Sequence, residues 1–456
     1  MKESPKIGLR SATALVIANM IGAGIFTTTG YQVSDLGDPV VILVLWALGG
    51  VLAFCGALCY AELGAAMPHS GGEYVYLRET LGPLFGFMSA FVSLVAGFSA
   101  PIAAALKGFV SYTFHPFPSL EEPLQVMFGL TGQDLLAALL VWILVAIHMR
   151  HLKVGFGFND LVTLFKVAGI GAILVAAVMF GKGDWSHLTT PAKAIVRPEG
   201  EAFWMASATS LVFVMFCYTG WNASAYVASE LREPQKKLPQ SLLLGTLVVM
   251  VLYLGLNIVY FYGAGSDALA GEAEVGLLAA RNLFGPVGSS LVTLVMAVSI
   301  LASASAMVIA GPRVYFAFAK DFKPLSMFAS INSNTGIPSR ALLLQGAVTT
   351  LLVFSGRIDQ IQQYAGFTLG LFSCLAVSCV FVLRWKAPNL ERPFRTWGYP
   401  VTPLLYLLGS GWMMVWAFRG RPAESSLSLA TVFLGGLLFY GVQLRQQRKS
   451  KEGRLS

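Results

Sequence analysis

About twelve long apolar runs dominate this chain of 456 residues. Most of them reach the roughly 20 residues that a helix needs to cross the hydrocarbon core of a bilayer. Hydrophobic residues make up 56% of the chain and charged residues only 12%, whereas a soluble domain has about 25% charged residues. Because backbone polar groups inside a bilayer must bond within the chain, the sequence predicts an all-α integral membrane protein.

The apolar runs also place the individual spans. We expect helices at 11–34, 39–66, 82–113, 134–149, 156–181, 203–230, 240–263, 286–320, 341–356, 358–384, 401–418 and 425–444. The segment 266–283 is expected to form a short helix outside the membrane.

The distribution of positive charge predicts the orientation. With the N-terminus placed inside, most of the 31 lysines and arginines fall on inner segments, which is typical of cytoplasmic loops. We therefore expect both termini in the cytoplasm of a multi-pass protein of the inner (plasma) membrane. The net charge of +8 is explained by this bias and needs no nucleic-acid partner. The basic tail from Arg445 to Arg454 is either an anchor to the inner surface or a solvated end.

All five cysteines lie inside apolar runs: Cys55, Cys59, Cys217, Cys374 and Cys379. A disulfide framework places cysteines in exposed loops of secreted domains. The sequence therefore predicts neither internal disulfides nor a disulfide-linked partner subunit.

Two glycines stand near the middle of the first span, in Met20-Ile-Gly-Ala-Gly-Ile-Phe26. Each glycine costs a helix interior about 1 kcal/mol relative to alanine, so the pair marks a place where the helix can unwind. Unwound backbone at membrane depth must line a cavity or be buried in protein. The pair therefore indicates either a binding site made of backbone groups or close packing of helices through small residues.

A second interruption stands in the sixth span, in Phe216-Cys-Tyr-Thr-Gly-Trp-Asn222. The first and sixth spans begin two halves of five helices each, and an odd number of helices gives the halves opposite topology. Paired interruptions at corresponding positions are a sequence indicator of a transporter site.

The chain resembles the amino acid–polyamine–organocation transporters through an ordered set of motifs that covers nearly its whole length. Gly22-Ala-Gly-Ile-Phe26 is similar to the first-helix motif of that family, where Ser or Thr usually stands in place of Ala23. The other motifs are Tyr60-Ala-Glu-Leu-Gly64, Pro68-His-Ser-Gly-Gly72, Gly220-Trp221, Glu230-Leu-Arg-Glu-Pro234, Ile337-Pro338 and Arg392-Pro-Phe-Arg395.

The resemblance implies a leucine-transporter-like fold with two inverted five-helix repeats, in which helices 1 and 6 are broken. The repeats would span 1–181 and 182–384, and 385–456 would hold two further helices and the basic tail. It also implies a substrate that is an amino acid or a related amine.

A zwitterionic substrate needs donors for its carboxylate and acceptors for its ammonium group. The start of a helix offers free N–H groups and its end offers free carbonyls. By similarity to the family, the N–H groups of Ala23, Gly24 and Ile25 would bind the carboxylate. Carbonyls flanking the Gly22 and Gly220 breaks would face the ammonium, from Met20, Ile21, Phe216, Cys217 and Thr219.

Other substrate contacts follow from the same comparison. Phe216 stands where relatives carry an aromatic lid, although a core phenylalanine is the alternative. Asn222 either touches substrate or bridges helices, since a polar residue in a membrane needs partners. The pocket for the substrate side chain would include Gly97, Pro101 and Ala306. None of these three is acidic, which favours a neutral substrate.

Lys166 is a charged residue about ten residues into the fifth span, which corresponds to a depth of about 15 Å. A charge inside the membrane is a functional hypothesis by default. Many family members carry a lysine here, where sodium-coupled relatives of the same fold bind sodium between helices 1, 5 and 8. By this resemblance, the ammonium would bridge carbonyls near Gly22 and a hydroxyl of the eighth span, for which Ser303 is a candidate. Transport would then be sodium-independent, with Lys166 either a proton carrier or a permanent structural charge.

Four charged residues lie at predicted inner helix ends: Glu62, Glu230, Arg313 and Asp321. They are either solvated or paired in an inner gate.

The sequence thus favours a secondary transporter of neutral L-amino acids that works by alternating access, coupled to protons or to exchange. The alternatives are an antiporter of cationic amino acids or polyamines, and a membrane sensor of amino acids that does not transport. An enzyme is not expected, since no catalytic group of His, Asp, Glu or Ser stands at mid-membrane. The five histidines show no metal spacing, and no cofactor is expected.

Overall fold

The computed structural model describes residues 7–114, 130–150, 156–332 and 337–455. Over these residues the chain is helical, apart from turns and one isolated β-bridge between Ile7 and Leu231. The main helices are α1 (Leu9–Met20), α2 (Gly24–Leu36), α3 (Pro39–Ala66), α4 (Glu73–Leu81), α5 (Pro83–Val92), α6 (Ala100–Phe114), α7 (Gly132–Arg150), α8 (Phe156–Phe180), α9 (Gly200–Tyr218), α10 (Pro234–Leu269), α11 (Val275–Asp321), α12 (Ser339–Val353), α13 (Ile358–Lys386), α14 (Val401–Gly420) and α15 (Pro422–Leu455).

Shorter pieces of other helix types complete the described chain. A π-helix, η1 (Ser93–Ser99), joins α5 to α6, and a 3-10 helix, η4 (Ala223–Glu230), follows α9. Two further 3-10 helices, η3 (Trp185–Leu188) and η5 (Lys323–Ala329), lie in connections.

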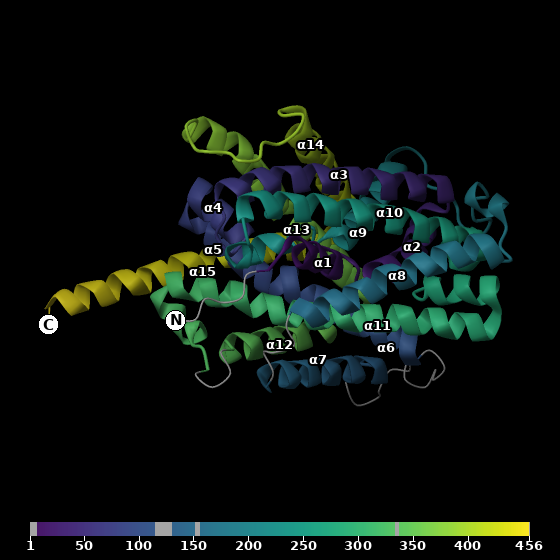
Figure 1. Ribbon diagram of the computed structural model, residues 1–456, viewed down its shortest axis with the longest axis horizontal. Helices are drawn as coiled ribbons and strands as arrows, with labels where there is room; N and C mark the ends of the chain where they lie inside the picture. The colour runs from purple at the N-terminus through teal and green to yellow at the C-terminus, as the bar shows by residue number, and fades with distance from the viewer. Residues whose placement is uncertain (1–6, 115–129, 151–155, 333–336, 456) are drawn as a thin grey trace.

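The helices form an elongated bundle with their axes mostly along its length (Figure 1). Within the described residues, eleven spans are long and apolar enough to cross a membrane, and α12 is a shorter apolar helix. The predicted all-α membrane fold with about twelve spans is therefore confirmed. The start of α1 and the end of α15 lie toward the same end of the bundle (Figure 1). Lys2, Lys6 and Lys153, which contribute to the predicted orientation, lie outside the described residues.

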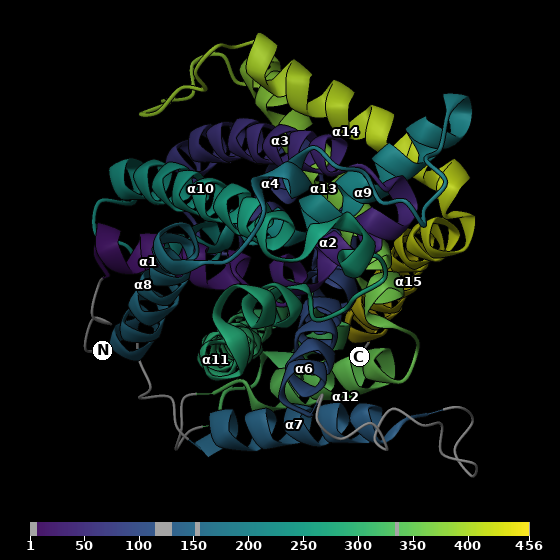
Figure 2. The same cartoon turned by 90° about the vertical axis from the view of Figure 1, so that its right-hand side faces the viewer.

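The first and sixth spans are both broken. The first consists of α1 and α2, and the sixth consists of α9 and η4, with non-helical residues between the two pieces in each case. Both views place α1 and α2 between α3 and α10 on one side and α11 on the other (Figures 1 and 2). Each interruption falls on the glycine-bearing segment that the sequence singled out.

The third span differs from the continuous helix expected over 82–113, because its middle is the π-helix η1. Pro101 stands two residues beyond the end of η1, near the start of α6. Proline has no N–H, and its ring clashes with the carbonyl four residues earlier, which belongs here to Gly97. The wider π-turn accommodates this conflict, and such turns are frequent at functional sites.

The connection between α10 and α11 contains a short helix, as the sequence predicts for 266–283. Gly265 (φ 67) bends α10 near its end, and Gly285 (φ 73) separates the first turns of α11 from its long part. Both backbone conformations lie in the left-handed region, which glycine adopts without a steric cost.

Asp321 and Glu62, two of the charged residues at predicted inner helix ends, have partners that fix their positions. Asp321 accepts hydrogen bonds from Arg78 and Tyr74, and Glu62 on α3 is only 1% exposed. Arg384 of α13 binds both oxygens of the Glu62 carboxylate, at 2.8 and 2.7 Å. The backbone N–H of Thr396 donates to the same carboxylate at 2.7 Å. Glu62 thus ties α3 to α13 and to the loop before α14.

Replacing Glu62 with alanine should therefore destabilise the protein markedly. Breaking a buried ion pair costs about 3–5 kcal/mol, and we expect the lower end because Arg384 is partly exposed. Thermal unfolding in detergent measures the loss. Glu79→Ala is the matched control, because Glu79 pairs with Arg78 at the surface, where such pairs contribute about 1 kcal/mol or less. Equal losses for the two variants would contradict the buried-pair account.

Candidate functional site

The gap between α1 and α2 exposes the ends of two helices inside the protein. Ile21 leaves the helical conformation (φ −76, ψ 88), and α2 starts at Gly24 with Ala23 as its N-cap. No side chain caps α2, because Ala23 has no hydroxyl. The first N–H groups of a helix have no partner within it and attract anions. The predicted carboxylate donors, Ala23, Gly24 and Ile25, are therefore at the start of a buried helix.

The two glycines of the first break have different surroundings. A Cβ atom added to Gly24 would lie 2.6 Å from Sγ of Cys217, a distance that real Cβ atoms do not show. A Cβ atom added to Gly22 would meet nothing closer than Oγ of Ser303, at 3.9 Å. Close packing therefore explains the glycine at 24, whereas the position of Gly22 has open space around it.

The break of the sixth span lies directly against that of the first. Thr219 has an extended ψ of 148, and Gly220 has a φ of 99. A Cβ atom at Gly220 would lie 2.8 Å from the backbone carbonyl carbon of Asn19. Since backbone cannot move aside as a side chain can, glycine is required here by both conformation and space.

The carbonyls at the end of α1 are already hydrogen-bonded. Met20 accepts from the N–H of Gly22 at 2.9 Å and from the hydroxyl of Tyr253 at 2.6 Å. The carbonyl of Ile21 accepts from Ser303 Oγ at 2.7 Å and from Lys166 Nζ at 3.3 Å. Because a carbonyl oxygen has two lone pairs, neither carbonyl is open to a substrate ammonium in this conformation.

The carbonyls at the end of α9 differ from one another. Phe216 accepts from both the N–H and the hydroxyl of Thr219, at 3.0 and 2.6 Å. The carbonyl of Cys217 lies 3.0 Å from the Tyr253 hydroxyl, whose one proton it shares with Met20, so at least one of its lone pairs has no donor among the described residues. Among the carbonyls predicted to face the ammonium, that of Cys217 is thus better placed to accept a hydrogen bond from it than those of Met20, Ile21 and Phe216.

Lys166 lies on α8 and is 1% exposed. Its Nζ donates to the carbonyls of Ala18 and Ile21, at 3.4 and 3.3 Å, and to Oγ of Ser303, at 3.2 Å. Oγ of Ser303 on α11 lies 2.5 and 2.7 Å from the same two carbonyl oxygens, which share its single hydroxyl proton. The structure therefore brings Lys166 and Ser303 together at the end of α1, and within the described chain no acidic side chain pairs with this lysine.

Asn222 lies at the far side of the second break from Phe216. Its Nδ2 donates to Oε1 of Glu73 at 3.1 Å and to the hydroxyl of Tyr226 at 3.2 Å. Of the two interpretations of Asn222, these contacts favour the one in which it bridges helices.

Two of the residues predicted to contact the substrate side chain approach the same part of α13. A Cβ atom on Gly366 would lie 3.2 Å from Cβ of Phe216, and one on Gly97 would lie 3.7 Å from Leu369. Gly366 and Leu369 are one helical turn apart, so Phe216 and Gly97 converge on one stretch of α13. Pro101 is buried on α6, and Ala306 follows Ser303 by one turn on α11.

The sequence interpretation missed Tyr253, whose hydroxyl joins the carbonyls of Met20 and Cys217 and thereby links the two breaks. A tyrosine in an apolar run looks like any other core aromatic residue. The only available signal is that a buried tyrosine hydroxyl needs a partner.

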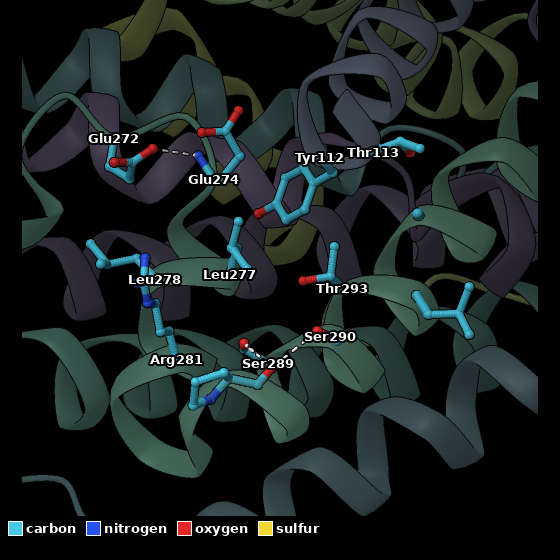
Figure 3. A pocket seen from close by; sticks show the side chains of 13 residues that line it. Tyr112, Thr113, Glu272, Glu274, Leu277, Leu278, Arg281, Ser289, Ser290 and Thr293 are labelled. Atoms are coloured by element: carbon cyan, nitrogen blue, oxygen red, sulfur yellow. Dashed lines mark hydrogen bonds between the residues drawn. The ribbon is translucent and has the colours of Figure 1, made fainter. Parts of the chain in front are cut away.

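A separate cavity of about 490 Å³ lies where α10 ends and α11 begins, toward the end of the bundle opposite the termini. Tyr112, Glu274 and Arg281 are among its lining residues (Figure 3). The hydroxyl of Tyr112 also contacts the carbonyl of Phe26 on α2. The cavity includes none of the residues predicted to bind substrate.

Comparison with known proteins gives a consistent result. The model of a family described as amino acid permease matches residues 7–439. The human large neutral amino acids transporter small subunit 2 is 27% identical over 450 residues, which cover 98% of this chain and 82% of the relative. The human b(0,+)-type amino acid transporter 1 is 27% identical over 439 residues, covering 95% and 87%. The serine/threonine exchanger SteT of Bacillus subtilis (strain 168) is 27% identical over 445 residues, covering 97% of each chain.

Proposed function

Because the chain belongs to the amino acid permease family, we propose that it is a sodium-independent transporter of neutral L-amino acids that works by alternating access. The match spans nearly the whole chain, so the resemblance found in the sequence motifs is confirmed. The three relatives described above are named as amino acid transporters or exchangers. The chain is accordingly a multi-pass amino acid transporter of a membrane.

The observation that carries the proposal is the contact between two broken helices. At this contact the uncapped start of α2 lies beside the end of α9, and Gly24 packs on Cys217. A carboxylate would bind the N–H groups of α2, and an ammonium group would bind the remaining lone pair of the Cys217 carbonyl. Both charges of a free amino acid are thereby satisfied by backbone groups.

The preference for neutral side chains rests on the pocket that we propose around Phe216, Gly97, Pro101 and Ala306. None of these residues carries a charge, and a buried cationic side chain without a partner is costly. A relative named for large neutral amino acids supports the same substrate class.

Independence from sodium rests on Lys166. Its ammonium group bonds two carbonyls and a hydroxyl, which are oxygen ligands of the kind that a small cation would use. We propose that this fixed positive charge takes the place of a coupling sodium ion. Exchange of one amino acid for another is the mode that the named activity of SteT supports, and proton coupling is the second mode.

The remaining features of the proposal concern assembly and orientation. We propose two inverted repeats, 1–181 and 182–384, in an inner (plasma) membrane with both termini in the cytoplasm. One relative is named a small subunit, and this name describes the assembly of that relative. The five cysteines here lie in α3, α9 and α13 and are buried or half-buried, which supports a chain without a disulfide-linked partner. We also propose that the protein transports its substrate without catalysing a chemical reaction.

Ligand-dependent thermal stability tests the site. Leucine, methionine or alanine should raise the melting temperature of the purified protein, by mass action on the folded state. Leucine methyl ester, which lacks the carboxylate, and the corresponding amine should not. Stronger stabilisation by arginine or putrescine than by leucine would contradict the neutral pocket and favour an antiporter of cations.

A further inference from the structure

Glu73 is a buried carboxyl group outside the candidate membrane spans. It is the first residue of α4 and is 4% exposed. The chain reaches it through Gly71 and Gly72, which have φ values of 130 and 53. A Cβ atom on Gly72 would lie 2.8 Å from the ring of Tyr226, so this turn packs tightly against η4. Glu73 is therefore held at the point where α4 meets the inner half of the broken sixth span.

Two side chains from different parts of the fold donate hydrogen bonds to the Glu73 carboxylate. Oε1 accepts from the hydroxyl of Tyr60 on α3 and from Nδ2 of Asn222, the latter at 3.1 Å. The second bond of the Asn222 amide, to the hydroxyl of Tyr226 at 3.2 Å, fixes its orientation. The carboxylate is thus the shared acceptor that ties α3 to the break before η4.

The titratable groups around Glu73 are tyrosines. They come from α3, α4, η4 and α14, and are Tyr60, Tyr76, Tyr226 and Tyr406. Within the described chain, no lysine, arginine or histidine forms an ion pair with Glu73. The nearby cation on α4, Arg78, pairs instead with Glu79 and Asp321. Burial, opposed by the hydrogen bonds from Tyr60 and Asn222, raises the pKa of Glu73 above its usual range.

We propose that Glu73 is a proton-binding site that controls how firmly α4 holds the inner half of the sixth span. As a carboxylate it accepts charge-assisted bonds from Tyr60 and Asn222, and such bonds are roughly twice as strong as neutral ones. When a proton binds, the negative charge is lost and these bonds weaken. The piece of η4 anchored through Asn222 is then freer to move. This inference rests on the proposed transport function, in which the broken helices change position.

Exchange measured at equal pH on both sides of the membrane tests the proposal without a proton gradient. Proteoliposomes loaded with unlabelled leucine should take up labelled leucine at a rate that differs about fivefold between the carboxylate and the protonated form of Glu73. This factor corresponds to about 1 kcal/mol, the contribution of one weakened hydrogen bond. This change should occur at a pH above the ordinary pKa of glutamate, because burial raises the pKa of Glu73. Glu73→Gln should flatten this profile, because glutamine carries no titratable proton.

Glu79→Gln is the matched control, since Glu79 is an exposed glutamate on the same helix, and it should keep the wild-type profile. Glu73→Asp, which retains a carboxyl group, should retain a pH-dependent rate. A wild-type profile in folded Glu73→Gln would overturn the proposal.

Infrared spectroscopy gives a second readout that needs no transport and so separates the proposal from the transport function. On acidification to a pH still above the ordinary pKa of glutamate, the wild type should gain a protonated carboxyl component that Glu73→Gln lacks. If the band is identical in both proteins, Glu73 does not bind the proton, whatever the chain transports.

Discussion

Replacing Lys166 with alanine is expected to reduce leucine exchange at least about tenfold. The substitution removes three hydrogen bonds, to Ala18, Ile21 and Ser303, and a hydrogen bond typically contributes about 0.5–1.5 kcal/mol. The end of α1 then loses the donor that bonds its carbonyls. Because α1 ends where substrate is proposed to bind, both the shape of the break and its electrostatics change. The initial rate of labelled leucine uptake into preloaded proteoliposomes measures the loss.

Lys182→Ala is the control for this experiment. Lys182 is exposed just beyond the end of α8, so its replacement changes the same chemical group on the same segment without touching the break. We expect wild-type exchange from it. If Lys166→Ala transports at the wild-type rate with an unchanged pH profile, the role given to this lysine is wrong.

Replacing Gly24 with alanine is expected to cause the second large loss. The added Cβ would lie 2.6 Å from Sγ of Cys217, and overpacking of this kind costs about 1–3 kcal/mol. Either α2 or α9 must shift, and both carry groups of the proposed site. Melting temperature and leucine exchange should both fall.

A second substitution should reverse this effect. Cys217→Ala removes Sγ, and the remaining Cα and Cβ atoms of residue 217 lie at 3.5 Å, which is ordinary van der Waals contact. The double variant Gly24→Ala/Cys217→Ala should therefore recover much of the stability, as a non-additive pair. Gly171→Ala is the control, since a Cβ atom there meets nothing within 4 Å. A double variant no more stable than Gly24→Ala alone would show that contact with Cys217 is not the cause.

The sequence predicts the breaks well because glycine interrupts an otherwise uniform apolar helix. Gly22, Gly24 and Gly220 stand out against long runs of leucine, valine and alanine. The structure also adds a distinction that the sequence cannot make. Glycine at 24 and at 220 is required by packing against a neighbouring helix, which depends on residues about two hundred positions away.

The π-helix of the third span could not be predicted in the same way. Helix type is read from the spacing of polar and apolar residues, and the residues around Gly97 are nearly all apolar. Pro101 indicates a disturbance, but not whether the helix kinks, ends or widens.

Polar contacts between distant segments are the other feature of the structure that the sequence does not predict. Glu62 and Glu73 look alike along the chain, as acidic residues near the C-terminal end of the second span. Only the folded arrangement shows that Glu62 pairs with Arg384, whereas Glu73 lies among tyrosines and an amide. Similarly, Met20 and Ile21 are suitable acceptors by position, but Tyr253, Ser303 and Lys166 already use their carbonyls.

Uptake of labelled leucine by proteoliposomes in a medium free of sodium tests the central claim most directly. With unlabelled leucine inside, the account predicts rapid uptake that sodium does not increase, that unlabelled methionine outside suppresses and that arginine leaves nearly unchanged. Omitting internal amino acid separates the two modes, because strict exchange then stops whereas proton-coupled uptake follows an imposed pH gradient. Uptake that requires sodium, or no uptake under any of these conditions by correctly folded protein, would contradict the account.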